Sequence, residues 1–134
     1  QMERLDSINA GRNRNASLLT ELIAGAEGIV TPKVPDGRTH VWHQYTVLLP
    51  HGVDRDAVIA AMRDRGVGAG AYYPRLVWDH DSYRDHPRVV TDSTPRAAHI
   101  AAHCLSLPVR PELTEADLQR VAAALIDTVR AERH

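Results

Sequence analysis

Hydrophobic side chains recur every three or four residues over the first part of the chain, residues 4–23. This period predicts a long amphipathic helix, which Gly25 is expected to end. The predicted apolar stripe consists of Leu5, Ile8, Arg12, Ala16, Leu19, Leu22 and Ile23. The polar residues 12–15 are expected to lie at solvent or at a subunit contact. We interpret residues 1–27 as a leading linker helix.

The stretch 39–74 has two extended patterns with a helical pattern between them. His40–Leu49 is rich in β-branched and aromatic residues with large side chains on both faces, which predicts a central strand. Asp54 is placed to cap a helix, and Gly66 stands where a helix C′ residue is favoured. The apolar face of this helix consists of Ala57, Val58, Ala61 and Met62. The glycine-dotted segment 67–73 is expected to form a second strand.

The second half of the chain predicts four further elements. A short helical turn is expected at 81–85, a helix at 95–103 and a short strand at 105–107. Thr114 and Asp117 approximate a capping box at the start of the last helix. The apolar stripe of that helix consists of Leu118, Val121, Ala122, Leu125 and Val129.

These elements predict one α+β domain over residues 1–134, in which 28–134 form the domain proper. We expect a small mixed or antiparallel sheet of about three strands, covered by helices on one side. The expected hydrophobic core consists of Val41, Tyr45, Val47, Val58, Met62, Leu107, Leu118, Val121 and Leu125.

Composition restricts the possible partners and the compartment. The net charge of −1 gives no electrostatic support for binding nucleic acid or an anionic membrane. Cys104 is the chain's one cysteine, so an internal disulfide is excluded and a reducing compartment is favoured. The sequence has no apolar run of the roughly 20 residues that a membrane span needs. We therefore expect a cytoplasmic protein.

Two histidine pairs have spacings that resemble parts of a metal site. His40 and His43 would point to opposite faces of a strand, so one ion could not easily bind both. His99 and His103 have the spacing of ligands on one face of a helix, next to Cys104. Neither pair has a third ligand at recognisable spacing, so no metal site is expected.

The loop 78–81 reads Trp-Asp-His-Asp and has the residue types of an acid, a base and a stacking platform. The same composition is typical of an exposed rim, and both interpretations stay open. The alternating glycines of 66–70 precede no helix, so they do not form a phosphate-binding loop. No catalytic triad can be assigned from spacing, and we predict no catalytic residue in this chain.

Four motifs in order carry a resemblance to a known family. They are His40-Val-Trp-His-Gln-Tyr-Thr-Val, Arg65-Gly-Val-Gly-Ala-Gly, Tyr72-Tyr73-Pro74 and Leu105-Ser-Leu-Pro-Val-Arg-Pro-Glu-Leu-Thr. Together they resemble the C-terminal domain of the DegT/DnrJ/StrS family of PLP-dependent aminotransferases, which act mainly on nucleotide-linked keto-sugars. The leading segment 4–16 is similar to the helix that joins the large domain to the small one, so the resemblance covers essentially the whole chain.

The resemblance implies the fold of the small domain of fold-type I PLP enzymes. The parent enzyme would be a homodimer that transfers an amino group from an amino acid, commonly glutamate, to a keto-sugar. Its PLP would form a Schiff base with a lysine of the large domain, which this sequence lacks. Lys33 is the chain's one lysine and matches no such motif. We expect this chain to bind no cofactor and to be inactive alone.

The resemblance also suggests which residues face the substrate. Tyr72 and Tyr73 match positions that point toward substrate in the family, and we add Arg75 and Trp78 from the loop that follows. Family members often continue Tyr-Pro-x-Pro-Leu-His, whereas this chain reads Tyr-Pro-Arg-Leu-Val from residue 73. This departure puts a sugar-nucleotide substrate in doubt, and Arg75 is expected to meet an anionic group.

One alternative comes from a different class of protein. A strand–helix–strand core would also suit a free-standing regulatory module of ferredoxin-like topology that binds a small molecule without catalysis. The long leading helix argues against it, because a compact ligand-binding domain has no need of such a helix.

Overall fold

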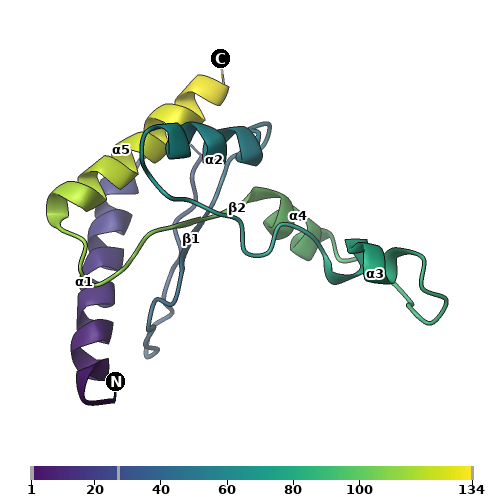
Figure 1. Ribbon diagram of the computed structural model, residues 1–134, viewed down its shortest axis with the longest axis horizontal. Coiled ribbons are helices and arrows are strands. Elements are labelled where there is room, and N and C mark those ends of the chain that lie inside the picture. The colour runs from purple at the N-terminus through teal and green to yellow at the C-terminus, as the bar shows by residue number, and fades with distance from the viewer. Residues whose placement is uncertain (1, 27, 134) are drawn as a thin grey trace.

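A short antiparallel sheet lies at the centre of the computed structural model, which describes residues 2–26 and 28–133 (Figure 1). The α-helices are α1 (Leu5–Ile23), α2 (Arg55–Asp64), α3 (Asp81–Arg84), α4 (Pro95–His103) and α5 (Glu115–Glu132). The strands are β1 (Tyr45–Leu48) and β2 (Cys104–Leu107), and 3-10 turns form at Met2–Arg4 (η1) and Val77–Asp79 (η2). Residues 1 and 27, the first and last of the predicted leading segment, lie outside the described residues.

The sheet pairs β1 with β2, and Tyr45 lies opposite Leu107. A single bridge extends each side: Val30 pairs with Leu48 next to β1, and Gly70 pairs with Ser106 next to β2. The α+β class with a small antiparallel sheet is thus confirmed, with two strands in the described residues in place of about three. The segment 67–73 contributes only the bridge at Gly70, because its glycines offer little side-chain surface for packing. The elements of the described residues do not follow the β-α-β-β-α-β order of a ferredoxin-like module.

The first strand is shorter than the sequence predicts because Trp42 interrupts it. The backbone of Trp42 has φ 48°, in the left-handed region, so side chains before Tyr45 no longer alternate as in a strand. The indole N–H of Trp42 donates to Oδ1 of Asn13 at 2.9 Å, and the ring is buried. Val41 is 55% exposed, so its predicted place in the core is wrong.

Side-chain caps set the starts of α2 and α5 as the sequence predicts. Oδ1 of Asp54 accepts from the backbone N–H of Asp56 at 2.9 Å. Gly66 has φ 74° directly after α2, a conformation that costs glycine nothing. At α5 the hydroxyl of Thr114 accepts from the N–H of Asp117, whose carboxylate accepts from the N–H of Thr114, completing the capping box.

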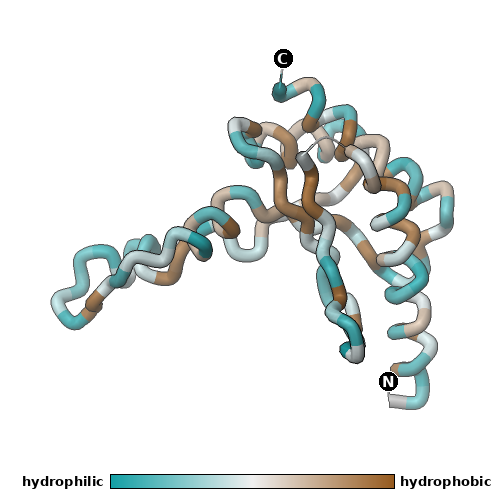
Figure 2. Tube along the Cα trace, turned by 180° about the vertical axis from the view of Figure 1, so that it is seen from behind, coloured by the Kyte–Doolittle hydropathy of each residue, from teal (hydrophilic) through white to brown (hydrophobic). Residues whose placement is uncertain are grey.

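The core forms where α5 packs against α1 and α2. Figure 2 shows the strands as a hydrophobic centre of the chain, with mostly hydrophilic residues along the outer faces of the helices. The predicted core residues other than Val41 are all buried: Tyr45, Val47, Val58, Met62, Leu107, Leu118, Val121 and Leu125. The hydroxyl of Tyr45 lies 2.8 Å from that of Thr20, and burial raises the pKa of Tyr45, which keeps the phenol protonated.

The polar stretch of α1 contacts the rest of the chain. Asn13 and Arg14 are exposed as predicted, but the predicted exposure of Asn15 is wrong. Asn15 is buried, and its amide donates to the carbonyl oxygen of Arg110 at 2.6 Å. Arg14 donates to the carbonyl oxygen of Pro111. These bonds form because the segment after β2 runs along α1 before α5 begins.

Residues 72–103 form an arm that extends away from the body of the molecule (Figure 1). None of the described residues in this arm is fully buried. The base of the arm is held by Arg55 at the start of α2, whose guanidinium donates to the carbonyl oxygens of Ala101 and Ala102. No helix among the described residues has the length and apolar character needed to cross a membrane.

The capping box predicts a pH dependence of stability. Hydrogen bonds from the side chain and backbone of Thr114 lower the pKa of Asp117 below its ordinary value of 3.8. A lowered folded-state pKa stabilises the fold above pH 3.8, and this contribution is lost as the pH falls through the lower folded-state value. Asp117→Asn should therefore be less stable than the unchanged chain from neutral pH down to about pH 5, and the difference should shrink toward about pH 2. Urea midpoints of the two chains across this pH range measure the difference in stability. A difference that does not change with pH would contradict the prediction.

Candidate functional site

An aromatic cavity of about 650 Å³ opens where the arm leaves the body. It is lined by Tyr72, Tyr73, Arg75, Leu76, Val77, Trp78, His80, Ala97, Ile100, Ala101 and Cys104. The structure therefore brings the four residues predicted to face substrate together at one cavity. The cavity lies between the segment after the Gly70 bridge and one face of α4.

The side chains of this aromatic cavity are available to a ligand. Tyr72 is 54% exposed and Tyr73 is 80% exposed, although both are large aromatic residues. Arg75 is exposed and makes no hydrogen bond or ion pair with any described residue. Trp78 is half-buried in η2. Behind them the thiol of Cys104 donates to the carbonyl oxygen of Tyr73 at 3.7 Å and closes the inner wall.

The predicted loop 78–81 is divided between cavity and rim. Trp78 and His80 line the aromatic cavity. Asp81 instead begins α3 and forms an exposed ion pair with Arg84 at 3.3 Å. The acidic part of this loop therefore fits the rim interpretation.

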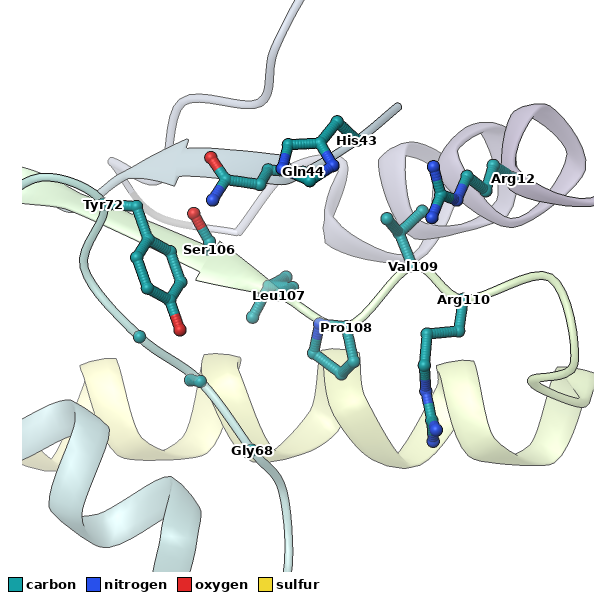
Figure 3. Close-up of a pocket in the computed structure, with 12 residues that line it drawn as sticks. Arg12, His43, Gln44, Gly68, Tyr72, Ser106, Leu107, Pro108, Val109 and Arg110 are labelled. Atoms are coloured by element: carbon teal, nitrogen blue, oxygen red, sulfur yellow. The ribbon is translucent and has the colours of Figure 1, made fainter. Parts of the chain in front are cut away.

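A second, arginine cavity of about 380 Å³ (Figure 3) shares Tyr72 with the aromatic cavity. Its lining consists of Arg12, His43, Gln44, Gly68, Ala69, Gly70, Tyr72, Ser106, Leu107, Pro108, Val109 and Arg110. Tyr72 belongs to both cavities because its ring turns back over Gly70. A Cβ at residue 70 would lie 2.9 Å from the Tyr72 hydroxyl, so this position requires glycine while Tyr72 keeps that place.

The arginine cavity has the charge of an anion-binding site. Arg12 lines it from α1. Arg110, in the segment after β2, also lines it, but its guanidinium points toward α5 and away from that of Arg12 (Figure 3). The Nε atom of Arg12 is buried and has no hydrogen-bond partner among the described residues. None of the described residues that line the cavity carries a carboxylate. An oxygen of a phosphate or carboxylate group would accept a hydrogen bond from this guanidinium.

Sequence reasoning did not predict the arginine cavity. Arg12 and Arg110 are far apart along the chain, and no motif connects them. One signal was present: Arg12 occupies a position on the apolar stripe of the first helix, where a charged residue is unusual.

The histidine pairs are placed differently from each other. His40 accepts the backbone N–H of Trp42 at its Nδ1 and packs against the Trp42 ring. His43 lines the arginine cavity instead, so these two do not act as a pair. His99 and His103 lie together on α4 and both contact the ring of His51.

The fold and cavities define a small α+β unit with a cationic and aromatic surface beside an exposed arm. The chain belongs to the DegT/DnrJ/EryC1/StrS aminotransferase family, whose model matches residues 1–126. The predicted resemblance is thereby confirmed.

Two relatives illustrate the match in sequence. The chain is 34% identical to a pleiotropic regulatory protein of Geobacillus stearothermophilus over 133 residues, covering 94% of this chain and 33% of that protein. It is 33% identical to the UDP-N-acetyl-3-dehydro-alpha-D-glucosamine 3-aminotransferase of Acidithiobacillus ferrooxidans, covering 96% of this chain and 33% of that enzyme. The chain thus spans about a third of the length of these relatives.

Solved structures share the fold. The aminotransferase TlmJ from Streptoalloteichus hindustanus superposes with a TM-score of 0.87 at 24% identity, over 100% of this chain and 35% of that one. DesV of S. venezuelae, solved in complex with a ketimine intermediate, superposes with a TM-score of 0.83 at 30% identity, over 96% of this chain and 33% of that one.

Proposed function

We propose that this chain is the C-terminal small domain of a PLP-dependent aminotransferase that transfers an amino group from an amino acid to a nucleotide-linked keto-sugar. The observation that carries the proposal is the family match over residues 1–126. The similarity to an enzyme named for amino transfer to a UDP-linked sugar supports this substrate class. Residues 1–27 would lead from the large domain, and the parent would act in the cytoplasm as a homodimer.

The contribution of this chain would be to bind and orient the amino acceptor. Tyr72, Tyr73 and Trp78 offer faces on which a sugar or base can pack. Arg75 is available beside them for a phosphate or carboxylate oxygen. Arg12, in the arginine cavity behind Tyr72, has a buried donor for a second anionic oxygen.

The described residues do not fit a covalent PLP site. PLP reacts through its aldehyde with a lysine held in a walled, desolvated pocket. Lys33 is exposed in the connector and lines neither cavity. The amino-transfer chemistry would therefore belong to the larger part of the parent protein, and this chain would supply binding groups only.

The apolar surface of the exposed arm supports the proposal that another part of the parent protein packs against it. Its apolar side chains Tyr73, Val77 and Ile100 are exposed although they lie close together on the aromatic cavity. A contiguous apolar surface of this kind is typical of an interface. The large domain or the second subunit of the parent would cover it.

The full-length parent protein tests the proposed function. With glutamate as donor and a nucleotide-linked keto-sugar as acceptor, the parent should form the amino-sugar and the corresponding keto acid. A parent that carries no PLP, or that transfers the amino group to no keto-sugar, would overturn the proposal.

The isolated chain should not form a PLP aldimine. After PLP is added, the visible absorbance band of an internal aldimine should be absent at one-to-one stoichiometry, because the one lysine lies in solvent. Lys33→Ala is the matched control. A stoichiometric band that disappears in Lys33→Ala would show that this chain does bind the cofactor covalently.

A further inference from the structure

Three histidines from two separate segments meet on the surface at the base of the arm. The nitrogen atoms that His51, His99 and His103 can offer a metal ion lie within 4.8 Å of one another. The ring centroids of His99 and His103 are 4.3 Å apart, and those of His51 lie 4.8 Å from His99 and 4.9 Å from His103. His51 is exposed and the other two are half-buried, so the cluster is open to solvent on one side.

Backbone contacts fix the segments that carry these rings. His99 and His103 are one turn apart on α4, which places both side chains on the same face. The N–H of Leu49 donates to the carbonyl oxygen of His103 at 2.9 Å, and His51 follows in the turn two residues later. Arg55, just after this turn, binds the carbonyl oxygens at the end of α4. The segments that carry the three rings are therefore held next to each other by the fold.

One ring has a defined tautomer. The Nδ1 atom of His103 lies 2.7 Å from the carbonyl oxygen of His99. A carbonyl oxygen accepts only, so Nδ1 carries the proton and Nε2 of the neutral ring keeps a free lone pair. Metal-binding histidines are commonly oriented by this type of backbone hydrogen bond.

We propose that His51, His99 and His103 bind one divalent transition-metal ion of the zinc class, with a fourth position open to water. Imidazole nitrogens suit Zn²⁺, Ni²⁺ and Cu²⁺. Tetrahedral Zn²⁺ with Zn–N bonds of about 2.0–2.1 Å needs ligand nitrogens about 3.4 Å apart. Side-chain rotation would bring the three nitrogens, which lie within 4.8 Å of one another, to this spacing.

The third ligand is what the sequence pattern lacked. The expectation of no metal site rested on His99 and His103 having no partner at recognisable spacing, and His51 stands 48 positions before His99. The bound ion would tie α4, and so the base of the arm, to the turn between β1 and α2. This proposal does not depend on the proposed aminotransferase function.

Titration of the metal-free chain with Zn²⁺ tests the proposal by calorimetry. One ion should bind per chain. His51→Ala and His99→Ala should each weaken binding by more than the roughly 10- to 100-fold that loss of an outer-shell partner costs. His86→Ala is the matched control, because His86 is an exposed arm histidine outside the cluster. Far-UV circular dichroism verifies that each variant keeps its helices.

Co²⁺ in place of Zn²⁺ identifies the ligands by absorption. Ligand-field bands of four-coordinate Co²⁺ should appear, without the thiolate charge-transfer band that binding to Cys104 would add. Zn²⁺ should also raise the melting temperature of the unchanged chain and leave that of His51→Ala unaltered. The proposal would be overturned if the unchanged chain bound Zn²⁺ no more tightly than folded His51→Ala. It would also be overturned if His86→Ala lost as much Zn²⁺ affinity as the cluster variants, or if the Co²⁺ spectrum showed a thiolate band.

Discussion

Replacing Leu125 by Ala is expected to lower the free energy of unfolding by about 2–5 kcal/mol. Leu125 is 0% exposed, on the face of α5 that belongs to the core. The substitution removes buried apolar surface and leaves a cavity that the helices can close only in part. The loss should appear as a lower urea midpoint with an unchanged slope, followed by far-UV circular dichroism.

Leu5→Ala is the matched control, because it makes the same substitution on a helix at a side chain that is 43% exposed. A surface change of this kind usually alters stability by about 0.5 kcal/mol or less. If Leu125→Ala lost no more stability than Leu5→Ala, the assignment of the buried face of α5 would be wrong.

The helices could be predicted because their signals are local. Asp54 and Thr114 cap the first turns of their own helices, and Gly66 ends α2 within the same short stretch. The apolar stripe of α5 follows the helical period, so five of its buried residues could be read from spacing, whereas the burial of Ala124 and Thr128 was not predicted. These features depend on neighbours within a few positions along the sequence.

The edges of the sheet could not be predicted in the same way. The left-handed backbone of Trp42 accompanies a hydrogen bond to Asn13, which lies on a different element. That turn leaves Val41 exposed, although alternation placed it with the core residues of the strand. Asn15 is buried because it reaches the carbonyl oxygen of Arg110, a contact that no local pattern indicates.

The same distinction holds for the candidate sites. Tyr72, Tyr73, Arg75 and Trp78 lie within one short segment, so their meeting at a single cavity followed from their positions in the sequence. The arginine cavity and the histidine cluster instead combine segments from distant parts of the chain. Their residues meet only through tertiary packing, which the spacing of residues does not encode.

Arg75→Ala in the full-length parent should raise the KM for the amino acceptor by roughly ten- to a hundredfold. Arg75 lines the aromatic cavity and has no partner among the described residues, so its guanidinium is free to bind an anionic oxygen of the acceptor. The loss of a hydrogen bond to a charged group typically costs about 1.5–3 kcal/mol. The half-reaction with the amino donor should stay nearly unchanged. Single-turnover absorbance measurements of each half-reaction separate the two.

Two further variants define what Arg75 contributes. Arg75→Lys keeps the charge but cannot form the paired hydrogen bonds of a guanidinium, so it should recover only part of the affinity. Arg88→Ala removes an exposed arginine of the same arm that lines neither cavity, and it should leave both half-reactions unaltered. Equal losses in both half-reactions of Arg75→Ala would assign Arg75 a structural role, because a binding contact to the acceptor alone cannot slow the reaction of the donor. No loss in either would leave Arg75 at the solvent rim.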